Sequence, residues 1–258
     1  MLDQLNYLKQ FHINNAWQQL EAVLQAGFLA GTPDFSGLEV TFGSPKLSLG
    51  LEIALTWLDN PQFQWQAQAE RMVTIDGESF NLPEVTADLA DWRDLLLCLK
   101  LAGIDIWTAL QQTQEVAQSL APTVATSDNP AKQLALRLAG KIGLIISAEQ
   151  LRPVGDWWRQ CLEQRAGNLC FNQPIDQLNN RGWQSHPIEK PFAVIDLPNH
   201  QDQAKFDRKN RQLSGKMPAS YQLKPVSDQP VGQLLELLLM AEATSFYLAV
   251  LNKQSLNR

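Results

Sequence analysis

Side chains that exchange a proton near neutral pH are scarce in this sequence. Its 258 residues include three histidines and three cysteines. The cysteines, Cys98, Cys161 and Cys170, are odd in number and have no CxxC spacing, which argues against a disulfide framework and against a zinc site. The sequence also lacks a GxGxxG or GKS/T loop of the kind that holds a nucleotide. We therefore expect neither a metal nor an organic cofactor.

Basic clusters and targeting signals are also scarce. Lysine and arginine number 21 against 27 aspartates and glutamates, and the one short basic cluster, KFDRKNR, occupies 205–211. Polyanion binding is not expected, so we predict no nucleic-acid partner. The first ten residues show no basic segment followed by an apolar one, so we expect no signal peptide and a cytoplasmic location.

Long apolar runs are limited to one stretch, 234–251, which approaches the length of a membrane span. It contains Glu236 and Glu242, and each carboxylate would be costly inside a bilayer. We predict a helix buried within the protein and no membrane association.

Apolar residues follow helical and strand periods in alternation along the chain. This alternation predicts an α/β fold, a three-layer sandwich with mainly parallel sheets. The amide-rich segment 160–182 is expected to be the end of a helix followed by a turn-rich loop. The predicted elements are helices over 5–27, 87–121, 154–166, 202–213 and 234–251, a strand, loop and helix over 38–58, and strands over 72–77, 141–147, 191–198 and 221–226.

A polar segment that contains Pro130 divides the chain. We predict a reduced N-terminal lobe over 1–122, a linker and helix start over 123–137, and a C-terminal lobe over 138–258. Ligands of parallel sheets lie beyond the carboxyl ends of the strands, where helix N-termini hold anions.

Two loops occupy such positions, 42–48 and 147–153. The first contains Ser44 and Ser48, and the second contains Ser147 and Arg152. We take these four residues as candidate ligand-binding residues. The alternatives are that Ser44 caps the following helix and that Arg152 forms a surface ion pair.

The sequence from Asn129 onward resembles the second half of the bifunctional phosphoglucose/phosphomannose isomerases, whose two lobes are SIS (sugar isomerase) domains. The resemblance is carried by Asn-Pro-Ala-Lys at 129–132, the apolar strand that follows, the Trp-containing helix at 154–166 and the closing AEATSFYLAVLNK. It implies two SIS-like lobes, a sugar-phosphate ligand, and a homodimer with the cleft near the subunit boundary.

The resemblance does not extend to the catalytic residues of the family. Active family members carry a Glu near the end of the Trp-containing helix and a His in a Leu-Asn-His loop, and alignment puts Gln164 and Asn180 at these positions. An amide cannot exchange the protons that aldose–ketose isomerisation moves, although it can hydrogen-bond sugar hydroxyls. The fallback acid/base residues are His186 and Glu163. A neighbour such as Glu163 points about 100° away from Gln164 on an α-helix.

The first half departs further from the family. It has no Gly-Met-Gly-Gly-Ser loop, and the family's phosphate-binding Ser-Tyr-Ser-Gly-Asn-Thr corresponds to FGSPKLSLGLEIAL, which retains Ser44 and Ser48. The first SIS-like lobe is therefore expected to be reduced.

Three functions fit these observations. The first is a catalytically degenerate SIS protein that binds a phosphorylated carbohydrate. The second is an active glucose-6-phosphate/mannose-6-phosphate isomerase with displaced acid/base residues, and the third is a non-catalytic protein-interaction scaffold.

Overall fold

A computed structural model describes residues 66–69, 72–75, 78–81, Leu95, Leu99, 106–178, 192–199, 201–214 and 218–252. The described residues fall into two compact units, which divide between Thr108 and Ala109. The predicted elements at 5–27 and 38–58 lie outside the described residues. Before Ile106, the helix predicted over 87–121 is described only at Leu95 and Leu99, which are helical and buried.

The strands before Thr108 form an antiparallel sheet in the order β1-β2-β3. They are β1 (Gln66–Ala69), β2 (Met72–Ile75) and β3 (Glu78–Asn81). The strand predicted at 72–77 is confirmed by β2. The expectation of mainly parallel pairing does not hold for these three strands, because connections of two residues can join antiparallel strands but cannot make a parallel crossover.

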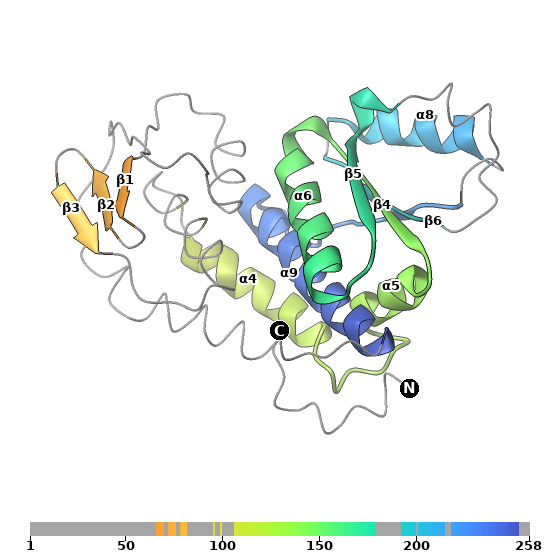
Figure 1. Cartoon of the computed structure of the whole chain (residues 1–258), viewed down its shortest axis with the longest axis horizontal. Coiled ribbons are helices and arrows are strands. Elements are labelled where there is room, and N and C mark those ends of the chain that lie inside the picture. Colours follow the sequence, from red (N-terminus) through yellow and green to blue (C-terminus); the bar gives the residue numbers. More distant parts are fainter. Residues whose placement is uncertain are drawn as a thin grey trace. The chain divides into compact units, whose positions relative to one another are not determined.

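The second unit contains a four-stranded parallel sheet in the order β5-β4-β6-β7 (Figure 1). Its strands are β4 (Ile142–Ser147), β5 (Cys170–Pro174), β6 (Phe192–Leu197) and β7 (Tyr221–Gln222). The central strands β4 and β6 confirm the predictions at 141–147 and 191–198. Five of the six residues in each are buried, as expected for strands that are covered on both faces.

Strand β5 corrects the prediction of a continuous loop after the helix end in 160–182. It pairs in parallel with β4, and Asn172 lies opposite Ile145. Its outer position in the sheet explains why the apolar pattern does not mark it. Phe171 is half exposed, and the next two residues are the amides Asn172 and Gln173.

Helices cover the sheet on both faces. The helix α6 (Arg152–Gln160) contacts β4 and β5, and it also contacts α9 (Pro230–Leu251), which in turn packs against α5 (Pro130–Leu138). The opposite face carries α8 (Gln203–Leu213), which reaches β6 through a Lys209–Asp196 ion pair (Figure 1). The α/β fold with a parallel sheet is thus confirmed for this unit.

The closing helix α9 is the buried helix that the sequence predicted. By length and composition it is apolar enough to cross a membrane, but most of its apolar window is buried inside the protein. Its buried Glu236 accepts hydrogen bonds from the backbone N–H groups of Val226 (2.6 Å) and Ser227 (2.9 Å). These two bonds compensate for the desolvation of the carboxylate.

The Asn-Pro-Ala-Lys motif builds the start of α5. The Asn129 side chain accepts from the Lys132 backbone N–H at 3.0 Å, and Pro130 occupies the first turn, where its missing N–H costs nothing. The buried Lys132 ammonium donates to the carbonyls of Pro122 (2.9 Å) and Val124 (2.7 Å). The motif therefore holds the preceding turn against the helix.

Tyr247 of the closing helix completes the same junction. Its hydroxyl donates to the Leu120 carbonyl at 2.5 Å, at the end of α4 (Ile106–Ser119), and its ring lies under the Lys132 ammonium. Burial raises the pKa of the Tyr247 hydroxyl above its ordinary value. We call Asn129, Lys132 and Tyr247 the buried junction. The lobe boundaries around 123–137 stay a prediction.

Candidate functional site

The carboxyl ends of three neighbouring strands are tied together by side chains. Asn199, after β6, donates to the Gln150 side chain after β4 at 3.2 Å. Lys205 of α8 forms an ion pair with Asp176, after β5, at 2.8 Å and a second one with Asp202 at 2.9 Å. We call this region the carboxyl edge. It is the place where parallel sheets bind ligands.

Arg152 lies at the carboxyl edge as the first residue of α6. Its side chain is exposed, and it forms no hydrogen bond or ion pair with another side chain that the structure describes. The alternative of a surface ion pair is thus not realised among the described residues. A guanidinium beside a helix N-terminus adds its charge to the positive end of the helix dipole, and both attract an anion.

Ser147 lies beneath Arg152 and is fully buried. Its hydroxyl donates to the Asn172 side-chain oxygen at 3.1 Å, and the Asn172 amide donates to the Arg152 carbonyl at 2.9 Å. Gly155 makes room for this arrangement, because a Cβ there would lie 2.2 Å from the Asn172 oxygen. Ser147 and Asn172 therefore position the first turn of α6, and direct ligand binding by Ser147 stays a prediction.

Gln164 lies at the other end of this helix. Residues Cys161–Arg165 continue α6 as one π-helical turn. Gln164 is exposed there and accepts a long hydrogen bond from Gln160 at 3.5 Å. Glu163 is partly exposed and pairs with Arg159 at 2.9 Å. π-Helical turns are rare and often lie at functional sites.

Gln164 and the last described residue before Asn180 lie at opposite ends of β5. Gln164 lies near the amino end of β5, whereas Leu178, the last described residue before Asn180, follows the carboxyl end. A five-residue strand of roughly 15 Å separates them. Asn180, His186, Ser44 and Ser48 lie outside the described residues.

Comparison with known proteins identifies the fold family. Residues 127–255, half of the chain, match the family of the bacterial phospho-glucose isomerase C-terminal SIS domain. The chain belongs to this family. Its SIS domain therefore includes both the buried junction and the carboxyl edge.

Two solved structures resemble the chain. A glucose-6-phosphate isomerase like protein from Thermus thermophilus is 22% identical with a TM-score of 0.57, over 66% of this chain and 59% of that chain. This similarity supports the SIS fold alone. The C-terminal domain of glucosamine-fructose-6-phosphate aminotransferase from Francisella tularensis is 12% identical with a TM-score of 0.43, over 65% of this chain and 53% of that chain. No match is found among curated proteins.

One polar cluster of the SIS domain was not predicted. Trp157 donates its ring N–H to Glu242 of α9 at 3.2 Å, the Cys161 thiol lies 3.4 Å from the same carboxylate, and Arg165 forms an ion pair with it. The spacing of four residues places these three donors on one helix face. That spacing was a usable signal, but the acceptor lies some 80 residues away. The cluster fixes the π-helical turn, which bears Gln164, against α9.

The cysteines of the SIS domain, Cys161 and Cys170, are buried thiols. Burial raises the pKa of the Cys170 thiol from 9.0 to about 12, with a smaller contribution from the Glu163 charge. Within the described residues no three His, Cys, Asp or Glu side chains are grouped closely enough to hold a metal ion. The absence of a cofactor stays a prediction.

Proposed function

We propose that this SIS protein binds a phosphorylated carbohydrate at the carboxyl edge without isomerising it. The observation that carries the proposal is the exposed Arg152 guanidinium at the first residue of α6, which has no side-chain partner in the described part of the chain. A phosphate accepts paired hydrogen bonds from a guanidinium and further ones from the N–H groups of a helix start.

The remaining groups of the carboxyl edge suit a sugar. Gln150 and Asn199 join through their side-chain amides at 3.2 Å, which leaves each amide with further donor or acceptor capacity. A sugar hydroxyl both donates and accepts, so amides recognise it without a net charge. Phosphate binding by Arg152 and hydroxyl binding by these amides together define the ligand class.

The absence of catalysis is the second part of the proposal. Gln164 stands at the position that alignment gives to the catalytic Glu, and an amide does not exchange protons near neutral pH. Asn180 stands at the position of the His. The observation that Gln164 is exposed, with a long hydrogen bond to Gln160, agrees with a position that has no acid/base function.

We also propose that the protein is a homodimer. Gln164 and Leu178 lie at opposite ends of β5 in one chain. The resemblance to the phosphoglucose/phosphomannose isomerases, which implies a cleft near the subunit boundary, supports this proposal. Sedimentation of the purified chain tests this, and a monomer would contradict it.

One observation favours the second candidate function, an active isomerase. A π-helical turn contains one residue more than an α-helical turn. The position that corresponds to the catalytic Glu of the family therefore differs by one residue when it is counted forward from Trp158 and when it is counted back from Ala166. One of these registers replaces Gln164 by Glu163, a carboxylate that pairs with Arg159.

Turnover and ligand stabilisation separate the two functions. We expect glucose 6-phosphate, mannose 6-phosphate or fructose 6-phosphate to raise the melting temperature without interconversion, since a ligand that binds only the native state stabilises it. Arg152→Ala should weaken binding by roughly tenfold or more, the equivalent of about 1.4 kcal/mol.

Arg159→Ala is the matched control, because Arg159 is an exposed arginine on the same helix that faces Asp156 and Glu163. Equal loss of binding in both variants would refute a phosphate site at Arg152. Turnover that disappears in Glu163→Gln and persists in Gln164→Ala would establish the active isomerase instead.

A further inference from the structure

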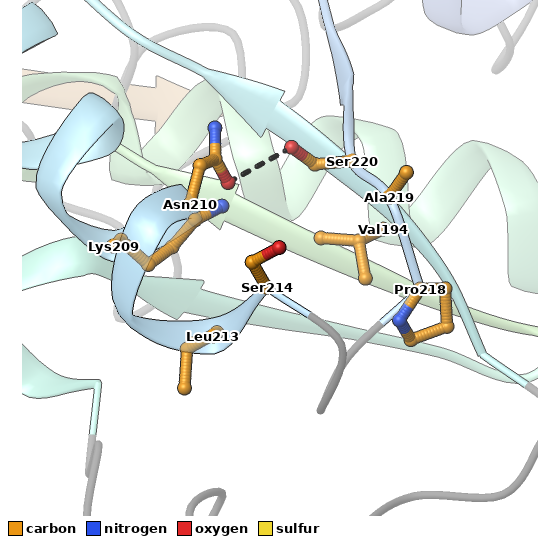
Figure 2. A pocket seen from close by; sticks show the side chains of 8 residues that line it. All are labelled: Val194, Lys209, Asn210, Leu213, Ser214, Pro218, Ala219 and Ser220. Carbon is orange, nitrogen blue, oxygen red and sulfur yellow. Dashed lines mark hydrogen bonds between the residues drawn. The ribbon is translucent and has the colours of Figure 1, made fainter.

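A cavity lies on the α8 face of the sheet. Its volume is about 320 Å³, it is partly open to solvent, and it is lined by β6, the C-terminal end of α8 and the segment before β7 (Figure 2). Because α8 runs antiparallel to β6, the end of α8 lies beside the amino end of that strand. The cavity lies on the α8 face of the sheet, and Arg152 begins α6, which covers the other face, so the two lie on opposite faces.

Lys209 supplies the most deeply buried polar group of this cavity. Its side chain is 5% exposed and lies over the Phe206 ring. An ammonium group has three donors, and among the described residues its one hydrogen-bond acceptor is Asp196, at 2.5 Å. Burial lowers the pKa of Lys209, and Asp196 opposes part of that decrease. The other N–H groups of the ammonium are not used by these residues. A buried donor without an acceptor is costly, so these groups favour a bound molecule that accepts hydrogen bonds.

The neighbouring polar groups are held in fixed orientations. The Asn210 amide donates to Asp196 at 3.3 Å, and its oxygen accepts from the Ser220 hydroxyl at 3.1 Å (Figure 2). Ser214 adds an exposed hydroxyl at the end of α8. These groups are arranged before any ligand binds, which reduces the entropy that binding costs.

The charge of the cavity favours an uncharged ligand. Lys209 and Asp196 neutralise each other, and the C-terminal end of α8 carries a partial negative charge that opposes an anion. The wall that faces α8 is largely apolar and includes Val194, Pro218 and Ala219 (Figure 2). An uncharged ring that bears hydroxyl groups matches both sides. Its C–H groups would face this wall, and its hydroxyls would face Lys209, Asn210 and Ser214.

The volume agrees with a ligand of that kind. Taking about 30 Å³ for each water molecule, the cavity has space for roughly ten waters or for a similar number of ligand atoms. We propose that this cavity binds an uncharged polyol of monosaccharide size, at a site separate from the carboxyl edge.

Saturation-transfer NMR and calorimetric titration of the full chain with glucose test the proposal, with acetate as an anionic probe. We expect binding of glucose and none of acetate. Ser214→Leu, which fills the cavity from an exposed position, should weaken glucose binding by roughly tenfold or more. Ser127→Leu, at an exposed serine outside the cavity, should leave it unchanged.

Asn210→Leu provides a second variant within the cavity, and circular dichroism of each variant verifies its folding. Absence of glucose binding to the native chain overturns the proposal. So does equal binding by native protein and both cavity variants, or loss of glucose binding in Arg152→Ala, which would place the sugar at the carboxyl edge. Because the probe lacks a phosphate, failure here is distinguishable from failure of the proposed sugar-phosphate site.

Discussion

The buried junction and the carboxyl edge each contain a cationic side chain, but the two side chains differ in burial and in their partners. At the junction, Lys132 is fully buried and donates to backbone carbonyls. At the edge, Arg152 is exposed and has no side-chain partner among the described residues. The comparison shows that the motif by which the chain resembles its family is architectural, while the residues available to a ligand carry little of that resemblance.

The largest effect expected from this contrast is at Lys132. Lys132→Met removes hydrogen bonds from a buried charged donor to two partly buried carbonyls, so we expect a loss of about 3 kcal/mol in the free energy of unfolding. Urea unfolding measures it. Lys141→Met, at an exposed lysine, is the control. Equal stability of the two variants would show that the junction does not hold the turn.

A smaller loss is expected where the sheet meets α6. Gly155→Ala places a Cβ 2.2 Å from the Asn172 side chain, so we expect about 2 kcal/mol of destabilisation by overpacking. The double variant with Asn172→Ala should recover part of this loss, since it removes the clashing atom. Additive losses would argue that the two side chains do not meet.

The cluster at Glu242 should contribute less, because Arg165 is partly exposed. Glu242→Gln keeps an acceptor for Trp157 but removes the ion pair, and we expect a loss of about 1 kcal/mol. The difference from native protein should shrink in high salt, which screens exposed charges. A loss that salt leaves unchanged would indicate a packing effect.

The smallest effect on stability is expected at the carboxyl edge itself. Arg152→Ala should change the free energy of unfolding by less than about 0.5 kcal/mol, because exposed positions without partners contribute little. The same variant should weaken sugar-phosphate binding. A large loss of stability would show that Arg152 supports the fold and would argue against its role in ligand binding.

Prediction from the sequence worked where burial imposes a pattern. The apolar segments at 141–147 and 191–198 predicted β4 and β6, although β6 also contains the buried Asp196, and the helix predicted at 154–166 is present as α6, which begins two residues earlier, at Arg152. The edge strand β5 was missed because its five residues include the exposed Phe171 and the partly buried amides Asn172 and Gln173, which give no apolar pattern. Its pairing partner, rather than its composition, makes it a strand.

The candidate site was predicted in part. Arg152 lies at a helix start beside the strand ends, as expected, whereas Ser147 is buried and supports Asn172. The π-helical turn around Gln164 has no sequence signature, because the Glu242 cluster that holds it is formed by contacts with a distant helix.

The sequence by itself determined which segments become buried strands and helices, since apolar periodicity depends only on neighbours along the chain. The tertiary structure decided which polar groups have a partner within the protein and which remain available to a ligand. Lys132, Arg152 and Lys209 are all cations in the sequence, yet one holds backbone carbonyls, one stays exposed and one faces a cavity beside Asp196. The partners of a charged group come from distant segments, so only the folded chain assigns its function.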